Sequence, residues 1–181
     1  MIDPDVQKIA DALGTSVSQL YMLSNLRSVR TKRKKTHRYT NYHKVVIHRG
    51  RGRKNRILSV PNGFLKQVQR KILTTYLYTL PVSVHAKAYQ PETSVVQNAL
   101  PHVGKECIAK LDISHFFDSI DTDMVYSVMR RLGLSVPATT LLTHICTYQG
   151  KLPQGAPTSP RIANLVMCRF DERIAAWCAA H

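Results

Sequence analysis

The chain has 181 residues, a hydrophobic fraction of 44% and a formal net charge of +15. This length suits one ordinary domain or two small ones that share a core, and the hydrophobic fraction excludes wholesale disorder. The sequence has no apolar run near the roughly 18 residues that span a bilayer, no basic-then-apolar start and no metal-type cysteine spacing, so we expect a cytoplasmic protein without membrane contact.

Two short amphipathic helices are predicted at the N-terminus. Residues 4–13 place Val6 and Ile9 on one face, and Gly14 ends this helix. A second helix is expected over about residues 16–26. The pair resembles the start of a helix-turn-helix, although two such helices around a glycine are more often plain packing.

A strongly basic stretch follows these helices. Between Arg27 and Arg56 there are thirteen Lys or Arg residues and no acid, which is half of the 26 cations in the chain. Such a stretch is either a solvated arm or a site for a polyanion, and Tyr39, Tyr42 and His43 among the cations favour unpaired nucleic acid. The candidate RNA-binding cations are Arg33, Lys34 and Lys35.

The rest of the chain predicts a hairpin, several helices and one central strand. Residues 44–60 suit a hairpin because β-branched residues precede an Arg/Gly turn and an apolar return strand. The other predicted elements are helices over about residues 63–78, 93–103, 121–132, 137–148 and 160–181, and a short buried strand over residues 107–113.

The predicted strand delivers a carboxylate, Asp112, at its end. A strand can hold a metal ligand rigidly, and Mg²⁺ prefers oxygen ligands. Nucleotidyl transfer uses two such ions about 4 Å apart to bind the attacking and leaving oxygens. The alternative for a lone Asp after a strand is a turn or a helix cap.

Two segments about forty residues apart carry a family resemblance. Residues 112–120, Asp-Ile-Ser-His-Phe-Phe-Asp-Ser-Ile, and residues 152–160, Leu-Pro-Gln-Gly-Ala-Pro-Thr-Ser-Pro, resemble motifs A and B of the prokaryotic reverse transcriptases of retrons and group II introns. The resemblance covers about residues 39–181. It implies an α+β fold, a right-hand polymerase fingers–palm fragment with a partial antiparallel palm sheet and helices packed on it.

The same resemblance implies three parts of the chain. Residues 1–38 would be an N-terminal helical, basic segment, residues 39–105 a fingers-like region, and residues 106–181 a partial palm. The Tyr-x-Asp-Asp segment that the family places after motif B does not occur in the sequence. We therefore expect a fragment that cannot polymerise alone.

In motif A the resemblance implies a metal site and a sugar gate. Asp112 would be the catalytic carboxylate that binds both metals, with the backbone carbonyl of Ile113 as a further ligand. The ring of Phe117 would lie under the incoming sugar and collide with a 2′-hydroxyl. From the residues alone, Phe116 and Phe117 would simply be core.

The nucleotide itself would be held by the hairpin and by motif B. Arg56 and Lys54 match the basic fingers hairpin that holds the triphosphate, because a triphosphate needs cations on a rigid element. Gln154 and Gly155 match the loop that contacts the incoming nucleotide, where glycine lets the backbone approach a ligand. Each segment taken alone could equally be an exposed basic turn or a structural loop.

An Asn-Ala-x-x-His element favours the retron branch of the family. Asn98 and His102 lie one helical turn apart, so both could face an RNA groove. Alternatively, they bond to each other or to the backbone in a buried helix.

The function expected from these features is RNA-directed DNA polymerisation. The implied cofactor is Mg²⁺ in a two-metal site that is incomplete here, and the implied partners are an RNA template and primer, the RNA–DNA hybrid, deoxynucleoside triphosphates and the protein's own non-coding RNA. The rival hypotheses are an RNA-binding remnant or accessory subunit without chemistry, a helix-turn-helix regulator, and an enzyme split over two chains.

Overall fold

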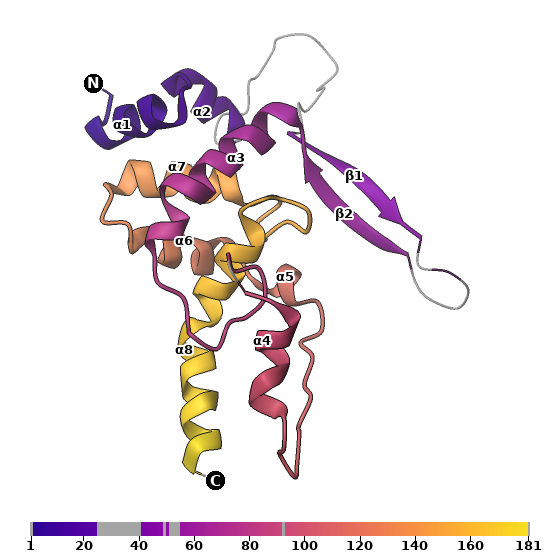
Figure 1. Cartoon of the computed structure of the whole chain (residues 1–181). Helices are drawn as coiled ribbons and strands as arrows, with labels where there is room; N and C mark the ends of the chain where they lie inside the picture. The colour runs from indigo at the N-terminus through magenta and orange to yellow at the C-terminus, as the bar shows by residue number, and fades with distance from the viewer. Residues whose placement is uncertain (1, 25–40, 49, 51–54, 92, 181) are drawn as a thin grey trace.

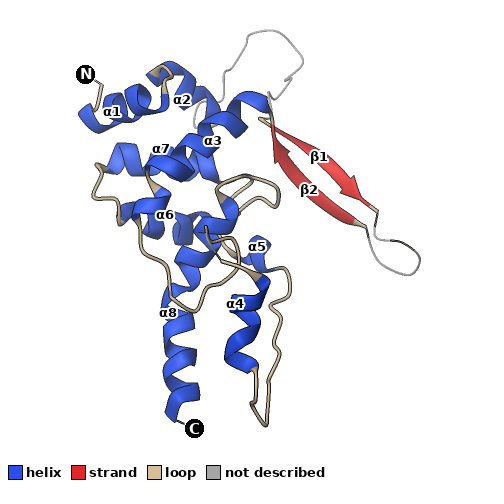
Figure 2. Ribbon diagram, viewed as in Figure 1, coloured by secondary structure: helices blue, strands red, loops and turns tan. Residues whose placement is uncertain are grey.

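The computed structural model describes residues 2–24, 41–48, 50, 55–91 and 93–180. Helices dominate these residues, and one hairpin projects from them (Figures 1 and 2). The elements in chain order are α1 (Pro4–Leu13), α2 (Val17–Leu23), β1 (Tyr42–Ile47), β2 (Arg56–Pro61), α3 (Gly63–Thr75), the 3-10 turn η1 (Leu77–Thr79), α4 (Val95–Ala99), the 3-10 turn η2 (Leu100–His102), α5 (Phe116–Ser119), α6 (Thr122–Arg130), α7 (Val136–Cys146) and α8 (Ser159–Ala180).

The predicted N-terminal helices are confirmed, and they pack rather than project. Helix α1 lies against α2, α3 and α7, and its apolar face is buried. The Asp3 side chain caps α1 by accepting from the N–H groups of Asp5 and Val6, and it also accepts from the Ser135 hydroxyl at 2.7 Å. Ser135 is the N-cap of α7, and its N–H donates to Asp5 at 2.9 Å. Two carboxylates therefore join the first turns of two helices.

These contacts also set the charge state of Asp5. The backbone N–H of Ser135, followed by the ammonium group of Lys8, holds the pKa of the Asp5 carboxyl below its usual value. Lys8 lies 3.3 Å from that carboxylate. The positive ends of α1 and α7 thus meet a negative charge, which stabilises both helix starts.

The hairpin forms as predicted and is anchored at one end. Strands β1 and β2 are antiparallel, in register from Tyr42 opposite Pro61 to Ile47 opposite Arg56. Tyr42 is buried and stacks on Tyr148 with ring centroids 4.4 Å apart. The buried Gln69 side chain of α3 donates to the Tyr42 hydroxyl at 2.8 Å and to the Ile145 carbonyl at 2.9 Å. This network fixes the base of the hairpin to α3 and α7.

The hydrophobic core is one cluster to which α1, α2, α3, α6, α7 and the first half of α8 contribute (Figure 1). Helix α7 buries most of its length, including Leu141, Leu142 and Ile145. Helix α8 buries Ile162 and Leu165, but its second half leaves the core, where Phe170 and Trp177 are half exposed or more. No helix among the described residues is both long and apolar enough to cross a membrane.

The predicted central strand over residues 107–113 is wrong. This segment has no regular structure and its side chains are exposed, with Leu111 at 89% of full exposure. A strand needs a neighbouring strand to accept its backbone hydrogen bonds, and the sheet in the described residues consists of β1 and β2 alone. The α+β composition is confirmed, but the expected palm sheet is not among the described elements. The predicted helix over residues 93–103 is shorter, as α4 and η2.

Candidate functional site

The loop between α7 and α8 carries the motif B residues and is held in place from both ends. The Leu152 N–H donates to the Ile120 carbonyl at 2.9 Å, and the Leu152 side chain is fully buried. At the other end, the Ser159 hydroxyl of α8 donates to the Pro153 carbonyl at 2.7 Å. These bonds and three prolines leave the loop little freedom, so it can present side chains in fixed positions.

Gly155 brings this loop against strand β2. Its φ is +113°, and a Cβ atom there would meet the Ser59 carbonyl oxygen at 3.2 Å and the Val60 side chain at 3.3 Å. Glycine tolerates both the dihedral angle and the contact. Gly155 was expected to let the backbone approach a ligand, and in the structure the partner that it approaches is the backbone of β2.

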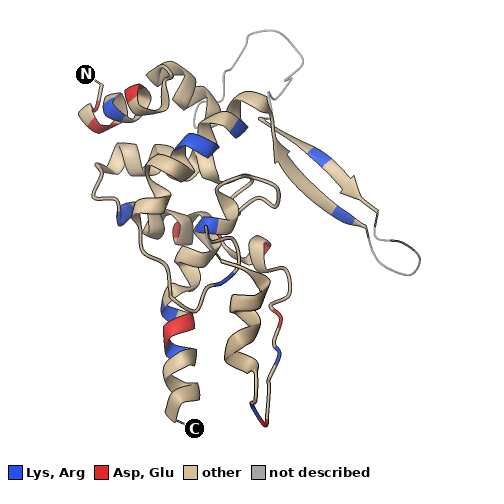
Figure 3. Ribbon diagram, in the orientation of Figure 1, with Lys and Arg blue, Asp and Glu red and all other residues tan. Residues whose placement is uncertain are grey.

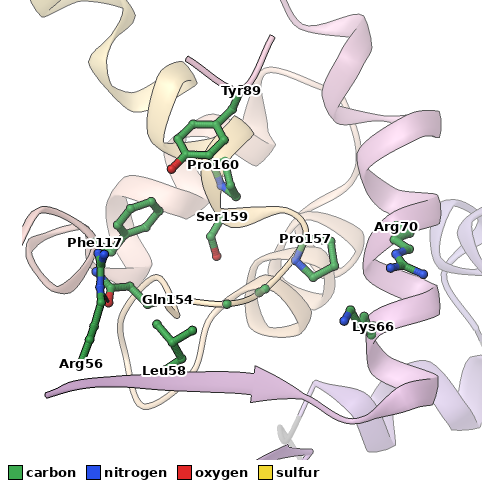
Figure 4. Close-up of a pocket in the computed structure, with 12 residues that line it drawn as sticks. Arg56, Leu58, Lys66, Arg70, Tyr89, Phe117, Gln154, Pro157, Ser159 and Pro160 are labelled. Atoms are coloured by element: carbon green, nitrogen blue, oxygen red, sulfur yellow. Dashed lines mark hydrogen bonds between the residues drawn. The ribbon is translucent and has the colours of Figure 1, made fainter. Parts of the chain in front are cut away.

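The close approach places Arg56 beside Gln154. The Arg56 Nε–H donates to the Gln154 side-chain oxygen at 2.9 Å, so residues 98 positions apart in the chain are in contact (Figure 4). Both were expected to contact the same nucleotide. Lys54, Arg33, Lys34 and Lys35, the other predicted basic site residues, lie outside the described residues.

A cleft of about 390 Å³ opens around this contact. Arg56 and Leu58 of β2 line one side, and residues 154–157 of the motif B loop and Phe117 of α5 also line it (Figure 4). Phe117 packs edge-to-face on Phe116 with ring centroids 5.7 Å apart. The predicted sugar-gate residue therefore shares a cleft with the predicted nucleotide-binding residues.

Three further residues of the cleft were not predicted from the sequence. Lys66 and Arg70 reach it from α3, and Tyr89 reaches it from the loop after η1. Two cations four residues apart on the polar side of a predicted helix were a usable signal for Lys66 and Arg70. Tyr89 lies in a segment without periodicity, so the sequence offered no comparable signal.

The electrostatics of the cleft favour an anion. The lining includes three cations, and none of its described residues is acidic. Strands β1 and β2 and helix α3 also carry Lys and Arg but no Asp or Glu (Figure 3). A concave surface with one sign of charge concentrates ligands of the opposite sign, such as phosphates.

The candidate metal ligands are not part of this cleft wall. Asp112 is exposed rather than held at the end of a buried strand, and Ile113 is 48% exposed. Neither residue is among the cleft-lining set. Within the described part of the chain, no three His, Cys, Asp or Glu side chains gather closely enough to hold a metal ion.

Asn98 and His102 are both exposed, on α4 and η2 respectively. Neither of these elements buries any residue. The alternative, that they bond to each other or to the backbone in a buried helix, is therefore wrong, because this segment is not buried. Their exposure leaves both side chains accessible to solvent and to a partner.

Comparisons with known proteins agree with the motifs. The family model for reverse transcriptase (RNA-dependent DNA polymerase) matches residues 47–179. Over 76% of its length the chain is 35% identical to the retron Ec86 reverse transcriptase of Escherichia coli. It is 34% identical to the retron Mx162 reverse transcriptase and 32% identical to the retron Mx65 reverse transcriptase, both of Myxococcus xanthus, over 94% and 93% of its length.

The matched regions cover only part of these relatives. The alignments span 42% of the Ec86 enzyme, 37% of the Mx162 enzyme and 42% of the Mx65 enzyme. The family model nevertheless covers strand β2, the Arg56–Gln154 contact and both motifs. On this match, which includes every described residue that lines the cleft, the chain belongs to the reverse transcriptase (RNA-dependent DNA polymerase) family.

Proposed function

We propose that the chain serves template-directed nucleotidyl transfer in an RNA-directed DNA polymerase of the retron type. The observation that carries this proposal is the cationic cleft in which Arg56 of the hairpin bonds to Gln154 of the motif B loop. Family membership supports the same activity. Residues 39–105 would act as a fingers-like region, residues 106–181 as a partial palm, and residues 1–38 as a helical, basic extension.

In this proposal the cleft binds a deoxynucleoside triphosphate. Arg56 holds the phosphates, since guanidinium forms strong charge-assisted bonds with phosphate oxygens, and Lys54 of the hairpin assists. Gln154 and the backbone at Gly155 contact the base and sugar side. Phe117, which lines the same cleft as Arg56, limits the space for a 2′-hydroxyl and so favours deoxynucleotides.

We also propose that Mg²⁺ is the cofactor, with Asp112 and the Ile113 carbonyl as ligands contributed by this chain. Bound Mg²⁺ would neutralise phosphate charge and stabilise the attacking and leaving oxygens. In this proposal Asp112 is the one carboxylate that the chain gives to both ions, so the chain alone should not polymerise. In primer extension with Mg²⁺ and all four deoxynucleotides we expect no product, and incorporation above background would refute this part of the proposal.

The nucleic acid partners would be an RNA template with its primer, the resulting RNA–DNA hybrid and the protein's own non-coding RNA. Asn98, His102 and the basic residues Arg33, Lys34 and Lys35 would contact RNA. Exposure of Asn98 and His102 supports this role. The cytoplasm would supply both RNA and nucleotides.

Binding of a nucleotide tests the cleft directly. We expect Arg56→Met and Gln154→Leu each to weaken binding of a deoxynucleoside triphosphate about 10-fold or more, measured by equilibrium dialysis with Mg²⁺ present. Arg169→Met is the matched control, because Arg169 is an exposed cation on α8 outside the cleft. Equal affinities for the wild type and both cleft variants would exclude a nucleotide site here.

A second candidate is RNA binding without chemistry, and the exposure of Asp112 favours it. It predicts salt-sensitive RNA binding that Asp112→Asn leaves unchanged, together with no dependence of nucleotide binding on Arg56. Nucleotide affinity that falls in Arg56→Met would favour the polymerase proposal instead.

A further inference from the structure

The backbone of Tyr89 adopts a conformation that aromatic residues rarely adopt. Its φ is +58°, in the left-handed region. For a bulky residue this conformation costs free energy, and it persists only where surrounding contacts offset that cost. The neighbouring residues are therefore expected to be fixed by contacts from elsewhere in the fold.

Helix α8 supplies those contacts on both sides of Tyr89. The Asn164 side-chain amide donates to the Ala88 carbonyl at 2.8 Å, and the Arg161 guanidinium donates to the Gln90 side-chain oxygen at 2.6 Å. The Thr93 hydroxyl also bonds to the Gln90 carbonyl at 2.9 Å. The chain is thus held immediately before and immediately after Tyr89.

Arg161 is itself a rigid anchor. It is only 7% exposed, and it donates to the Leu77 carbonyl at 3.2 Å and the Leu80 carbonyl at 2.6 Å. Its guanidinium carbon lies 5.2 Å from the centroid of the Tyr78 ring, in cation–π contact. Each of these partners lies on η1 or just after it, so α8 joins this turn to the Tyr89 loop.

The ring that this arrangement holds is not used for packing. Tyr89 is 66% exposed and lines the cleft, above Pro160 and on the opposite side from the hairpin strand that carries Leu58 (Figure 4). Lys66, Arg70 and Arg56 line the same cleft. A flat aromatic face near cations is the arrangement that binds a nucleotide, with the base on the ring and the phosphates on the cations.

We propose that Tyr89 stacks on an unpaired nucleobase in the cleft, and that Asn164 and Arg161 are positioning residues that fix its ring. The inference rests on the proposed function, because it requires the cleft to bind nucleotides. The base belongs either to a single-stranded RNA or to a free deoxynucleoside triphosphate. Both present the same aromatic face to the ring.

The test compares ligands with and without bases on the full chain. Twelve-residue oligoadenylate RNA is paired with an abasic ribose-phosphate strand of equal length, and dATP is paired with inorganic tripolyphosphate. We expect Tyr89→Leu to weaken binding of the oligoadenylate, of dATP or of both about 5- to 100-fold, without changing affinity for the baseless partner. Tyr89→Phe and Tyr89→Trp should restore binding, because both retain an aromatic face.

The two ligand pairs identify the source of the base. Loss confined to the oligonucleotide assigns Tyr89 to an RNA base, and loss confined to dATP assigns it to the free nucleotide. Unchanged affinity of Tyr89→Leu for both, or equal loss for base-containing and baseless ligands, overturns the inference. If Arg56→Met still lowers dATP affinity in that case, the proposed function stands without it. If the wild-type chain binds neither dATP nor the oligonucleotide, both fail.

Asn164→Ala tests the positioning role. It frees the Ala88 carbonyl but leaves the Tyr89 side chain intact. We expect the ratio of oligoadenylate to abasic affinity, or of dATP to tripolyphosphate affinity, to fall about 3-fold or more. A purely structural role would leave these ratios unchanged, and that result would remove Asn164 from the proposal.

Discussion

The two motif regions of this chain differ in how they are held. The motif B loop is bonded at Leu152 and Pro153, contacts β2 at Gly155 and shares a hydrogen bond with Arg56. The segment that carries Asp112 is exposed and has no strand partner in the described residues. The proposed nucleotide-binding residues of motif B are therefore held by contacts within the described residues, whereas the proposed metal ligand Asp112 is not.

The two motifs of this family therefore differ in how much each contributes to the stability of the fold. Motif B contributes both a buried core residue and a cleft wall, so its residues affect stability as well as binding. Motif A packs on the core through the partly buried Phe116 and Phe117 and the buried Ile120, whose carbonyl accepts the bond from Leu152, but its residues 112–115 are exposed. Substitutions in the two motifs should therefore have unequal effects on the free energy of unfolding.

The largest expected difference in the free energy of unfolding is between substitutions of two leucines. Leu152→Ala should lower the free energy of unfolding by about 2–5 kcal/mol, because it removes a fully buried side chain and leaves a cavity. Leu111→Ala, at a side chain 89% exposed, should change it by less than about 0.5 kcal/mol. Urea unfolding of both variants checks this difference, and equal losses would mean that residue 111 is packed in solution.

The next largest difference in stability is expected between substitutions of two arginines on α8. Arg161→Met should cost about 3 kcal/mol, because the Leu77 and Leu80 carbonyls lose a charged donor. Arg169→Met should cost little, because Arg169 is exposed. The midpoint of thermal unfolding compares the two variants. A small effect of Arg161→Met would show that the η1 turn does not depend on α8.

Substitutions of two glycines distinguish the energetic cost of backbone strain from the added cost of a close contact. Gly133 has a φ of +70° and open space where a methyl group would lie, so Gly133→Ala should cost about 1 kcal/mol from strain alone. Gly155→Ala adds a tight contact with β2, which must shift by a few tenths of an ångström, and should cost about 2 kcal/mol in unfolding free energy. Gly155→Ala should also weaken nucleotide binding, since it displaces the loop from Arg56. Identical behaviour of the two variants in denaturant and dialysis would contradict the loop–hairpin contact.

The smallest expected effect concerns the pH dependence of stability and the half-buried His144 of α7. Burial lowers the pKa of His144 on α7 below its usual value near 6.5, since the imidazolium ion loses hydration. The unfolded chain then binds more protons than the folded chain just below pH 6.5, so stability should fall as the pH decreases through this range. His144→Gln should flatten this part of the pH profile of unfolding free energy. A profile of equal slope in the variant would assign the dependence to other groups.

Much of the fold could be predicted because the relevant signals are local. The caps and apolar faces of the N-terminal helices and the β-branched strand of the hairpin each lie within a few residues. The prediction of a strand at residues 107–113 was wrong. An apolar run indicates that a segment could form a strand, but it does not indicate whether a partner strand lies beside it. The Leu111 side chain of this segment is therefore exposed and not packed against a neighbouring strand.

The site residues that belong to a sequence motif could be predicted. The site residues whose positions depend on contacts with distant parts of the chain could not. Arg56, Phe117 and Gln154 were identified from motif positions, and they line one cleft. Tyr89 was missed because its orientation depends on Asn164 and Arg161, more than seventy positions later. No local pattern around Tyr89 carries that information.

The shared carboxylates of Asp3 and Asp5 have a practical consequence for protein production. Because they serve the first turns of both α1 and α7, an affinity tag or protease site that replaces residues 3–5 would disturb two helices at once. Fusions that keep these residues intact, or that are attached after α8, preserve both. Low yield from a vector that alters the N-terminus would then reflect the loss of the hydrogen bonds that join α1 to α7, not a defect of the cleft.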